Sequence, residues 1–168
     1  PEVKLNAEGF RPLPAGGRLA MLAPPGAYTV KLMAGGREQT RPLTVRKDPN
    51  TTGTDADVTA QATLLTELRD EITQGADLIN RAERVRSQLV SLSAVMTDDE
   101  TGKVVKDAAD ALDQKIVAAE EPLHQMRQTG RGQDLLRYPG KLIDHLMFLA
   151  SGVSVADFAP TASQLEAH

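Results

Sequence analysis

The sequence predicts an α+β protein, in which a short antiparallel β region precedes a bundle of long, mostly antiparallel helices. Two observations carry this prediction. Apolar residues alternate in short runs between Gly and Pro in residues 1–48, whereas they recur every three or four positions in residues 55–168. The period changes across residues 49–54, which we interpret as a linker between the two parts.

Two strands are predicted around a pair of glycines. Residues 27–34 (AYTVKLMA) alternate between apolar and polar side chains, and residues 39–46 (QTRPLTVR) follow them. Between them, Gly35–Gly36 can supply the positive φ angles of a tight hairpin turn. Pro42 cannot donate a ladder hydrogen bond, so the second strand is expected at a sheet edge or at a bulge.

The β region looks too small to form a sandwich by itself. We expect a third strand at residues 18–22 and a very short fourth one at residues 3–5. A Tyr shortly after a Pro-Gly turn, such as Tyr28, is common near the end of immunoglobulin-like sandwiches. We therefore interpret the region as the terminal strands of such a sandwich. A small sheet packed on the helices and an autonomous hairpin cap are the alternatives.

The first helix is predicted over residues 55–95. Thr54 or Asp55 can cap its start, and Asp57 places a negative charge near the positive end of the helix dipole. So long an amphipathic helix needs a partner along most of its length. Its apolar positions keep helical spacing throughout: Val58, Ala62, Leu65, Leu68, Ile72, Ala76, Ile79, Ala82, Val85, Leu89 and Leu92.

The second long helix is predicted over residues 98–129. Thr97 and Glu100 have the spacing of a capping box at its start. Pro122 falls inside the apolar pattern and should kink or restart the helix, and two glycines after residue 129 should end it.

Two shorter helices are predicted after a connector at residues 131–138. One covers residues 139–151, with Pro139 in its first turn, and the other covers residues 160–168. Because a short turn joins the two long helices, we expect them to pack antiparallel, with the later helices covering their open groove.

Composition excludes several classes of function. Only 3% of the residues are aromatic, which disfavours a carbohydrate-binding face built on aromatic platforms. The net charge is −4 with no long basic run, so nucleic-acid binding is not expected. The absence of cysteine excludes disulfides, thiolate metal sites and cysteine nucleophiles. No apolar stretch approaches the ~20 residues that span a bilayer, so no membrane span is expected.

Histidines and acidic residues do not predict a metal site. His124, His145 and His168 are far apart in the sequence and lack the spacing of helical zinc ligands. Asp98–Asp99–Glu100 lacks the spacing of a calcium loop, and we interpret it as capping the second long helix.

Other candidate motifs are also interpreted as structural. Neither Gly16–Gly17 nor Gly35–Gly36 leads into a helix as a phosphate-binding loop does, and no serine has G-x-S-x-G context. We therefore predict no catalytic, cofactor-binding or metal-ligating residue and no cofactor. Five charged residues of the first helix are expected on a solvated face with modest ion pairs: Asp77, Arg81, Glu83, Arg84 and Arg86.

One group of residues is a candidate exposed patch. It lies around the predicted connector and comprises Arg131, Arg137, Tyr138 and Lys141. The alternative to a binding patch is a loop that is held in place by packing of the Tyr ring.

Three segments together resemble a known family. They are Pro25–Val30 (PGAYTV), Pro42–Pro49 (PLTVRKDP) and Tyr138–Leu142 (YPGKL), and Leu149–Val153 (LASGV) follows the last of them. In this order and spacing they resemble the C-terminal region of large exported bacterial β-propeller proteins with sortilin-like or neuraminidase-type (BNR) repeats, often labelled glycosyl hydrolases. The resemblance covers nearly the whole chain.

The resemblance implies a β-propeller upstream of this chain and a periplasmic or extracellular location. It brings no catalytic residue to this chain, because such residues would lie in the propeller. Gly140 stands where a second Pro is expected, which could alter the start of the third helix. In the family the final helix is expected to continue past the position of His168.

These observations lead to three hypotheses of function. The first is a non-catalytic C-terminal accessory region that braces the upstream propeller or presents a helical surface to a partner. The second is a self-association module, in which two chains close an apolar groove as a symmetric homodimer. The third, a part of a glycoside hydrolase, requires two carboxylates facing each other across a cleft. The scattered acidic residues do not predict such a pair, so no enzyme activity is expected.

Overall fold

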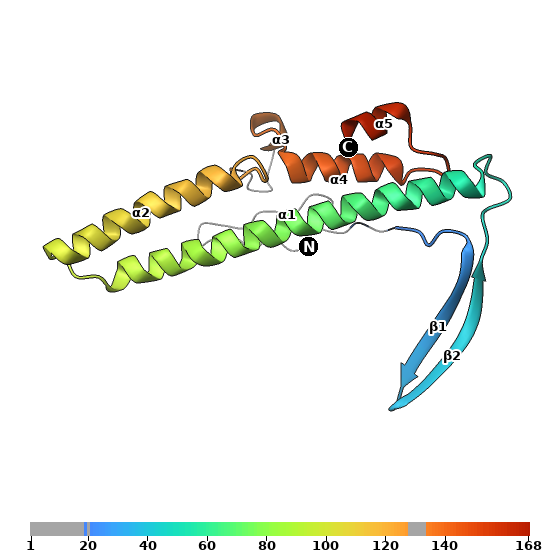
Figure 1. Ribbon diagram of the computed structural model, residues 1–168, viewed down its shortest axis with the longest axis horizontal. Helices are drawn as coiled ribbons and strands as arrows, with labels where there is room; N and C mark the ends of the chain where they lie inside the picture. The colour runs from blue at the N-terminus through green and yellow to red at the C-terminus, as the bar shows by residue number, and fades with distance from the viewer. Residues whose placement is uncertain (1–18, 20, 128–133) are drawn as a thin grey trace. The chain divides into compact units, whose positions relative to one another are not determined.

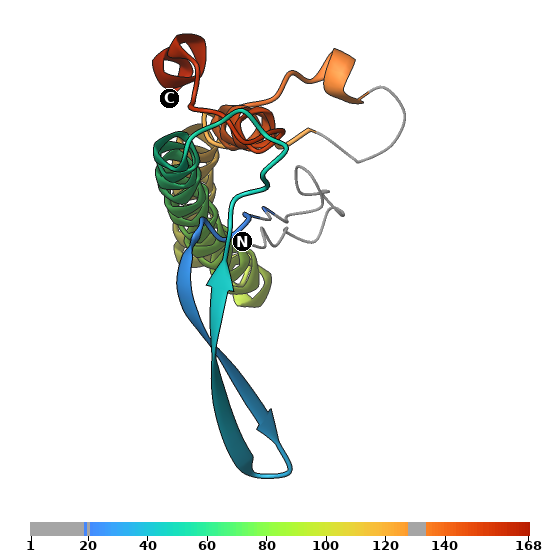
Figure 2. The same cartoon turned by 90° about the vertical axis from the view of Figure 1, so that its right-hand side faces the viewer.

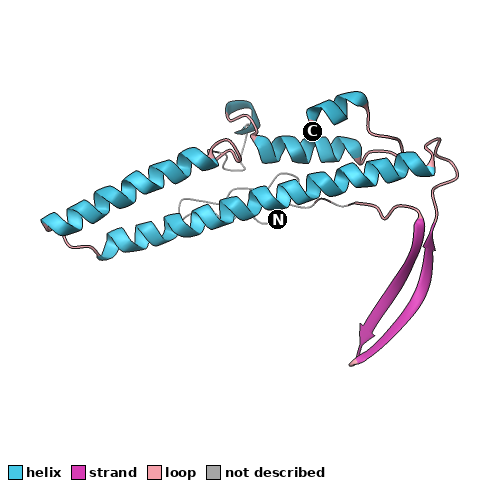
Figure 3. Ribbon diagram, viewed as in Figure 1, coloured by secondary structure: helices cyan, strands magenta, loops and turns pink. Residues whose placement is uncertain are grey.

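A computed structural model describes residues 19, 21–127 and 134–168 of the chain. Over these residues the protein is α+β, with a two-stranded antiparallel sheet and a larger helical part (Figure 3). The chain divides into two compact units. One contains Asp70–Phe148, and the other contains Ala20–Arg69 together with Leu149–His168.

The sheet is a single hairpin, β1 (Gly26–Ala34) and β2 (Arg37–Val45) (Figure 1). The strands pair along their whole length, with Ala34 opposite Arg37 at the closed end. Both turn residues have positive φ, 54° at Gly35 and 72° at Gly36, as a type I′ turn requires. The twist of such a turn matches the right-handed twist of the strands, and Figure 2 shows a long twisted ribbon. The predicted hairpin and its turn are confirmed.

The immunoglobulin-like sandwich is not confirmed. Leu19 and residues 21–22 belong to no strand, so the strand predicted at residues 18–22 does not extend over these positions. Pro24 and Pro25 follow immediately and offer no backbone donor, and pairing in the sheet begins only at Gly26. The strand predicted at residues 3–5 lies outside the described residues.

The long helix α1 (Asp55–Val95) begins at a reciprocal cap. The Thr54 hydroxyl accepts a hydrogen bond from the Asp57 amide at 3.1 Å, and the Asp57 carboxylate accepts one from the Thr54 amide at 2.8 Å. Of the two predicted capping residues, Thr54 is therefore the cap.

The apolar stripe of α1 is buried along only part of the helix. Val58, Leu64, Leu65 and Leu68 are buried in one unit, and Ile72, Ala76 and Ile79 are buried in the other. Beyond Ile79 the apolar positions of the stripe are only partly covered, whereas Glu83 is buried. Val85 is 40% exposed and Leu92 is 41% exposed, so the partner helix at this end of α1 leaves part of the apolar stripe in water.

Helix α2 (Glu100–Glu120) returns antiparallel beside the end of α1 (Figure 1). Its N-cap is Asp99, whose carboxylate accepts a hydrogen bond from the Gly102 amide at 2.7 Å. The predicted cap at Thr97 is therefore wrong. The Thr97 carbonyl instead lies against Gly102, so closely that a Cβ at this position would overlap with it.

Helix α2 ends at Glu120, although a helix was predicted up to residue 129. Pro122 explains the difference, because it has no amide to continue the hydrogen-bond ladder, although Glu121 before it keeps helical backbone angles. The chain turns instead. The carbonyls of this turn bond to the first amides of helix α4 (Leu142–Val153). The Pro122 carbonyl accepts a hydrogen bond from the Leu142 amide at 3.3 Å, and the Leu123 carbonyl accepts one from the Ile143 amide at 3.1 Å.

Three shorter helices complete the described part of the chain. Helix α3 (Asp134–Arg137) occupies the predicted connector. Helix α4 (Leu142–Val153) begins after the predicted residue 139, because the Asp144 carboxylate accepts a hydrogen bond from the Lys141 amide, at 2.9 Å, and caps the helix there. Helix α5 (Ala162–Ala167) replaces the predicted helix 160–168, because Thr161 is its N-cap.

Close packing holds α1 and α4 together in each unit. In the unit of residues 70–148, Gly75 lets the Ile143 side chain approach so closely that a Cβ would lie 3.2 Å from it. In the other unit, the buried Gln61 side chain donates to the carbonyls of Val153 at 2.6 Å and Ala156 at 2.5 Å. The Gln61 amide thus provides partners for carbonyls at the C-terminal end of α4.

Candidate functional site

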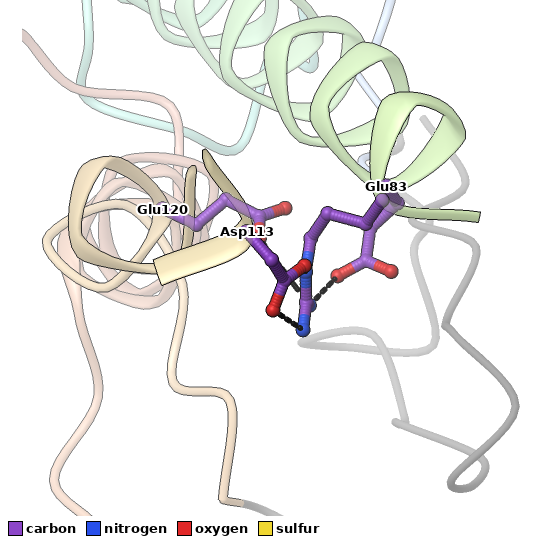
Figure 4. Close-up of polar contacts among 4 residues, drawn as sticks. Glu83, Asp113 and Glu120 are labelled. Carbon is purple, nitrogen blue, oxygen red and sulfur yellow. Dashed lines mark hydrogen bonds and ion pairs between the residues drawn. The ribbon is translucent and has the colours of Figure 1, made fainter. Parts of the chain in front are cut away.

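A buried cluster of charges joins α1 to α2, and we call Glu83, Arg86, Asp113 and Glu120 the ionic cluster (Figure 4). The Arg86 guanidinium binds in two directions. Its Nη1 lies 2.7 Å from Glu83 Oε1 on the same helix, and its Nε lies 2.7 Å from Asp113 Oδ1 on α2. Glu120 Oε2 lies 3.8 Å from Arg86 Nη1.

The ionic cluster is mostly shielded from water. The side chains of Glu83 and Glu120 are 5% and 3% exposed, and that of Arg86 is 12% exposed. The hydrogen bond to Asp113 raises the pKa of Arg86, while burial opposes that rise, so Arg86 stays protonated. Buried carboxylates are tolerated when they are paired with such a cation. The cluster therefore fixes α2 on α1 and offers no open cleft for a substrate.

One side of the hairpin carries Tyr28, Val30 and Leu32 on β1 and Leu43 and Val45 on β2, and we call these five residues the apolar face. The same side also carries Arg37, Gln39 and Arg41, and Arg41 lies opposite Val30. Residues directly opposite each other share a face, and the register pairs Tyr28 with Leu43. Val30, Leu32 and Leu43 are 49%, 60% and 47% exposed. These side chains are left in water, although burial of one face is what usually stabilises a small sheet.

The reverse face of the hairpin is mostly polar. It carries Thr29, Lys31, Glu38 and Thr40, and the Lys31 ammonium lies 2.7 Å from the Glu38 carboxylate. This pair is about half exposed and contributes little to stability. Met33, which is 73% exposed, also lies on this side, so the two faces differ only in that the apolar face carries more large apolar side chains.

The entry into β1 is held by the Tyr28 side chain. Its hydroxyl donates a hydrogen bond to the Pro24 carbonyl, four residues upstream, at 2.7 Å. The ring is half-buried, and it lies over the turn that starts the strand. This contact fixes the direction in which the apolar face begins.

Most residues singled out from the sequence lie apart. His124 is buried, whereas His145 and His168 are exposed. In the described part of the chain, no group of three or more His, Asp or Glu side chains is placed to hold a metal ion. Asp98 forms an ion pair with Lys106 at 2.6 Å and Asp99 caps α2, so this acidic segment has the capping role that was predicted for it.

The predicted solvated face of α1 needs a correction. Asp77, Arg81 and Arg84 are exposed, but Glu83 and Arg86 turn into the ionic cluster. Glu83 follows Ile79 by four residues and therefore continues the buried stripe of the helix. The helical spacing predicts burial of Glu83 if charged residues are counted on the stripe together with apolar ones.

The candidate patch around the connector is only partly described. Arg131 lies outside the described residues. Arg137 is exposed at the end of α3, while Tyr138 and Lys141 are half-buried.

No family model, no curated protein and no solved structure matches this chain. Among the described residues, no helix is both long enough and apolar enough to cross a membrane.

Proposed function

We propose that this chain is a non-catalytic accessory region of a larger exported bacterial protein, and that its hairpin is the interaction surface. In this proposal the apolar face packs on a second β layer, which belongs to the same larger protein. The helices then form a rigid support that braces an upstream β-propeller. The location would be periplasmic or extracellular.

The exposed apolar face of the hairpin is the observation that carries this proposal. A two-stranded ribbon is marginal by itself in water, and it becomes stable when its apolar side chains are covered. Sheets that pack face to face in sandwiches bury alternate side chains of each strand. The apolar face has this alternation, with Val30 and Leu32 on β1 and Leu43 and Val45 on β2.

Two further features support the proposal. The Tyr28 hydroxyl bonds to the backbone a few residues upstream, as the conserved tyrosine does at the corner of immunoglobulin-like sandwiches. Two of the segments that resemble the propeller proteins, Pro25–Val30 and Pro42–Pro49, contribute most of the residues of the apolar face. The segments that carry the resemblance therefore include most of the apolar face, which is left exposed to water.

A catalytic role receives no comparable support. The buried carboxylates, Glu83 and Glu120, lie close to one guanidinium and away from water. Glycoside hydrolysis needs two carboxylates that reach a substrate between them. We therefore do not propose a hydrolase activity for this chain.

The experiment compares two neighbouring substitutions on opposite faces, Leu32→Ser and Met33→Ser, both at exposed positions of β1. In this chain alone, at a concentration at which it is monomeric, both should change the free energy of unfolding by less than about 0.5 kcal/mol. In the larger protein that is proposed to contain this chain, Leu32→Ser should lower the stability of the hairpin region by about 2 kcal/mol, because a covered Leu is lost. Met33→Ser should remain neutral. Equal effects of the two substitutions in the larger protein would contradict the proposal.

A further inference from the structure

The direction of each backbone amide in the hairpin follows from its turn. A β-turn has four residues, here Ala34 to Arg37, and the carbonyl of the first accepts a hydrogen bond from the amide of the fourth. Ala34 and Arg37 therefore form a hydrogen-bonded pair of the ladder. Hydrogen-bonded and non-hydrogen-bonded pairs alternate along an antiparallel ladder. The pairs Lys31–Thr40 and Thr29–Pro42 are therefore non-hydrogen-bonded, and their amides point outward.

The outer edge of β2 is poorly suited to pairing. Pro42 stands where an outward amide is needed, and it has none to donate. Pairing of β2 with the same strand of a second copy, in full overlap, would also centre on Arg41 and place it opposite Arg41 of the second copy. Like charges directly opposite each other destabilise a pair of strands.

The outer edge of β1 has neither defect. Ala27, Thr29, Lys31 and Met33 direct amides and carbonyls outward without a proline among them. In full antiparallel overlap with β1 of a second copy, the pairing centres on Val30. Each outward residue then faces another outward residue: Thr29 lies opposite Lys31 of the second copy, and Ala27 opposite its Met33. In this register, outward amides therefore face outward carbonyls, and no two like charges lie directly opposite each other.

The same arrangement also pairs the apolar side chains. Val30 lies opposite Val30 of the second copy, and Tyr28 lies opposite its Leu32, in non-hydrogen-bonded pairs where side chains approach most closely. A two-fold axis perpendicular to the sheet keeps the apolar faces of the two copies on the same side. The interface is isologous and closes after two copies.

We propose that two copies of this chain associate through the outer edges of β1, forming a four-stranded antiparallel sheet in the order β2–β1–β1–β2. This association uses the strand edge, whereas the proposed accessory function uses the apolar face. The two are compatible, and they can fail separately.

The first test measures mass by light scattering over a concentration series for two matched variants, Lys31→Pro and Thr40→Pro. These residues are directly opposite each other, and each substitution removes one outward amide, from β1 or from β2. The parent chain and Thr40→Pro should rise from 18.0 kDa toward twice that mass. Lys31→Pro should raise the dissociation constant about tenfold or more, because the two-fold axis repeats the lost hydrogen bond. Lys31→Gln, which keeps the amide, should associate like the parent.

A second test uses disulfide formation, and it applies even if a proline variant no longer forms the hairpin. The chain has no cysteine, so Val30→Cys introduces a single thiol at the two-fold axis. Non-hydrogen-bonded pairs hold Cα atoms about 4.5 Å apart, within the range of a disulfide. Under mild oxidation Val30→Cys should form a covalent dimer much faster than Arg41→Cys, which lies opposite it on β2. Equal rates, or a parent chain that stays at 18.0 kDa at every concentration, would overturn the proposal.

Discussion

At the scale of single residues, Arg86 links the two long helices. It is the cation through which the buried Glu83 on α1 and Asp113 on α2 are held together. One guanidinium can serve both because its nitrogen donors point in several fixed directions. A lysine at this position would supply a charge but not this geometry.

Arg86→Ala should lower the free energy of unfolding by about 3–5 kcal/mol, because it leaves the Glu83 carboxylate buried without its guanidinium. Urea unfolding followed by circular dichroism measures the change. The matched control is Arg84→Ala on the exposed side of the same helix, which should stay within about 0.5 kcal/mol of the parent. Similar losses for the two variants would mean that the ionic cluster does not hold the helices.

Gln61 is a second residue whose role is specific. Gln61→Ala should lower the free energy of unfolding by about 1–3 kcal/mol, because two hydrogen bonds to the carbonyls of Val153 and Ala156 are lost, although the Ala156 carbonyl keeps the one from the Phe158 amide. Gln88→Ala, at an exposed position of α1, is the control and should be neutral. Comparison of the two denaturation midpoints checks this prediction, and equal midpoints would contradict it.

At this scale, the burial of a charged residue was not predicted from the sequence. The apolar stripe of α1 was predicted correctly through Val58, Leu65, Leu68, Ile72 and Ile79. Glu83 lies on the same stripe but was placed on the solvated face, because a charged side chain is buried only when a partner is available. Its partner Arg86 lies three residues further along the same helix, but the contact of Arg86 with Asp113 on α2, which completes the cluster, cannot be seen in the local pattern.

At the scale of elements, capping decides where helices begin. Asp57 and Asp99 each accept a backbone hydrogen bond at a helix start, and this lowers the pKa of both carboxyl groups below the usual 3.8. A lowered pKa in the folded state means that the ionised form is the stabilising one. The stabilisation is therefore complete above the unfolded pKa and is lost as the pH falls through the folded value.

Stability should accordingly fall between pH 5 and pH 3, and Asp99 should contribute to the fall. Asp99→Asn keeps a side-chain oxygen that can cap α2 but removes the titrating group. Its denaturation midpoint should drop less between the two pH values than that of the parent. Asp110→Asn, on an exposed part of α2, serves as the control and should drop as much as the parent. A drop in Asp99→Asn as large as in the parent would rule out this role of the cap.

Element boundaries were predictable where the chemistry is local. The Gly35–Gly36 turn and the start of α1 follow from residues that are adjacent in the sequence. The end of α2 was placed too late because the apolar spacing continues past Pro122, although a proline cannot continue the ladder. The cap was misplaced at Thr97, since the choice between Thr97 and Asp99 depends on the turn that brings Gly102 against the Thr97 carbonyl.

At the scale of the whole molecule, the two kinds of structure differ in how much they bury. The helices bury Leu68, Ile79 and Val153 completely, whereas the hairpin leaves its apolar face in water. Regions with few buried contacts open at low free-energy cost. We expect the hairpin to open well before the helices unfold, and the account of function depends on a surface that covers it elsewhere.

The most direct test is hydrogen exchange, read by mass spectrometry on peptides that span residues 26–45 and α1. It compares this chain, diluted to the concentration at which it is monomeric, with the larger protein that is proposed to contain it. The account predicts fast exchange of the hairpin and slow exchange of α1 in the chain alone, with the hairpin becoming protected in the larger protein. A hairpin that exchanges equally fast in both proteins, or one already as protected as α1 in the chain alone, would contradict the claim that its apolar face is an interaction surface.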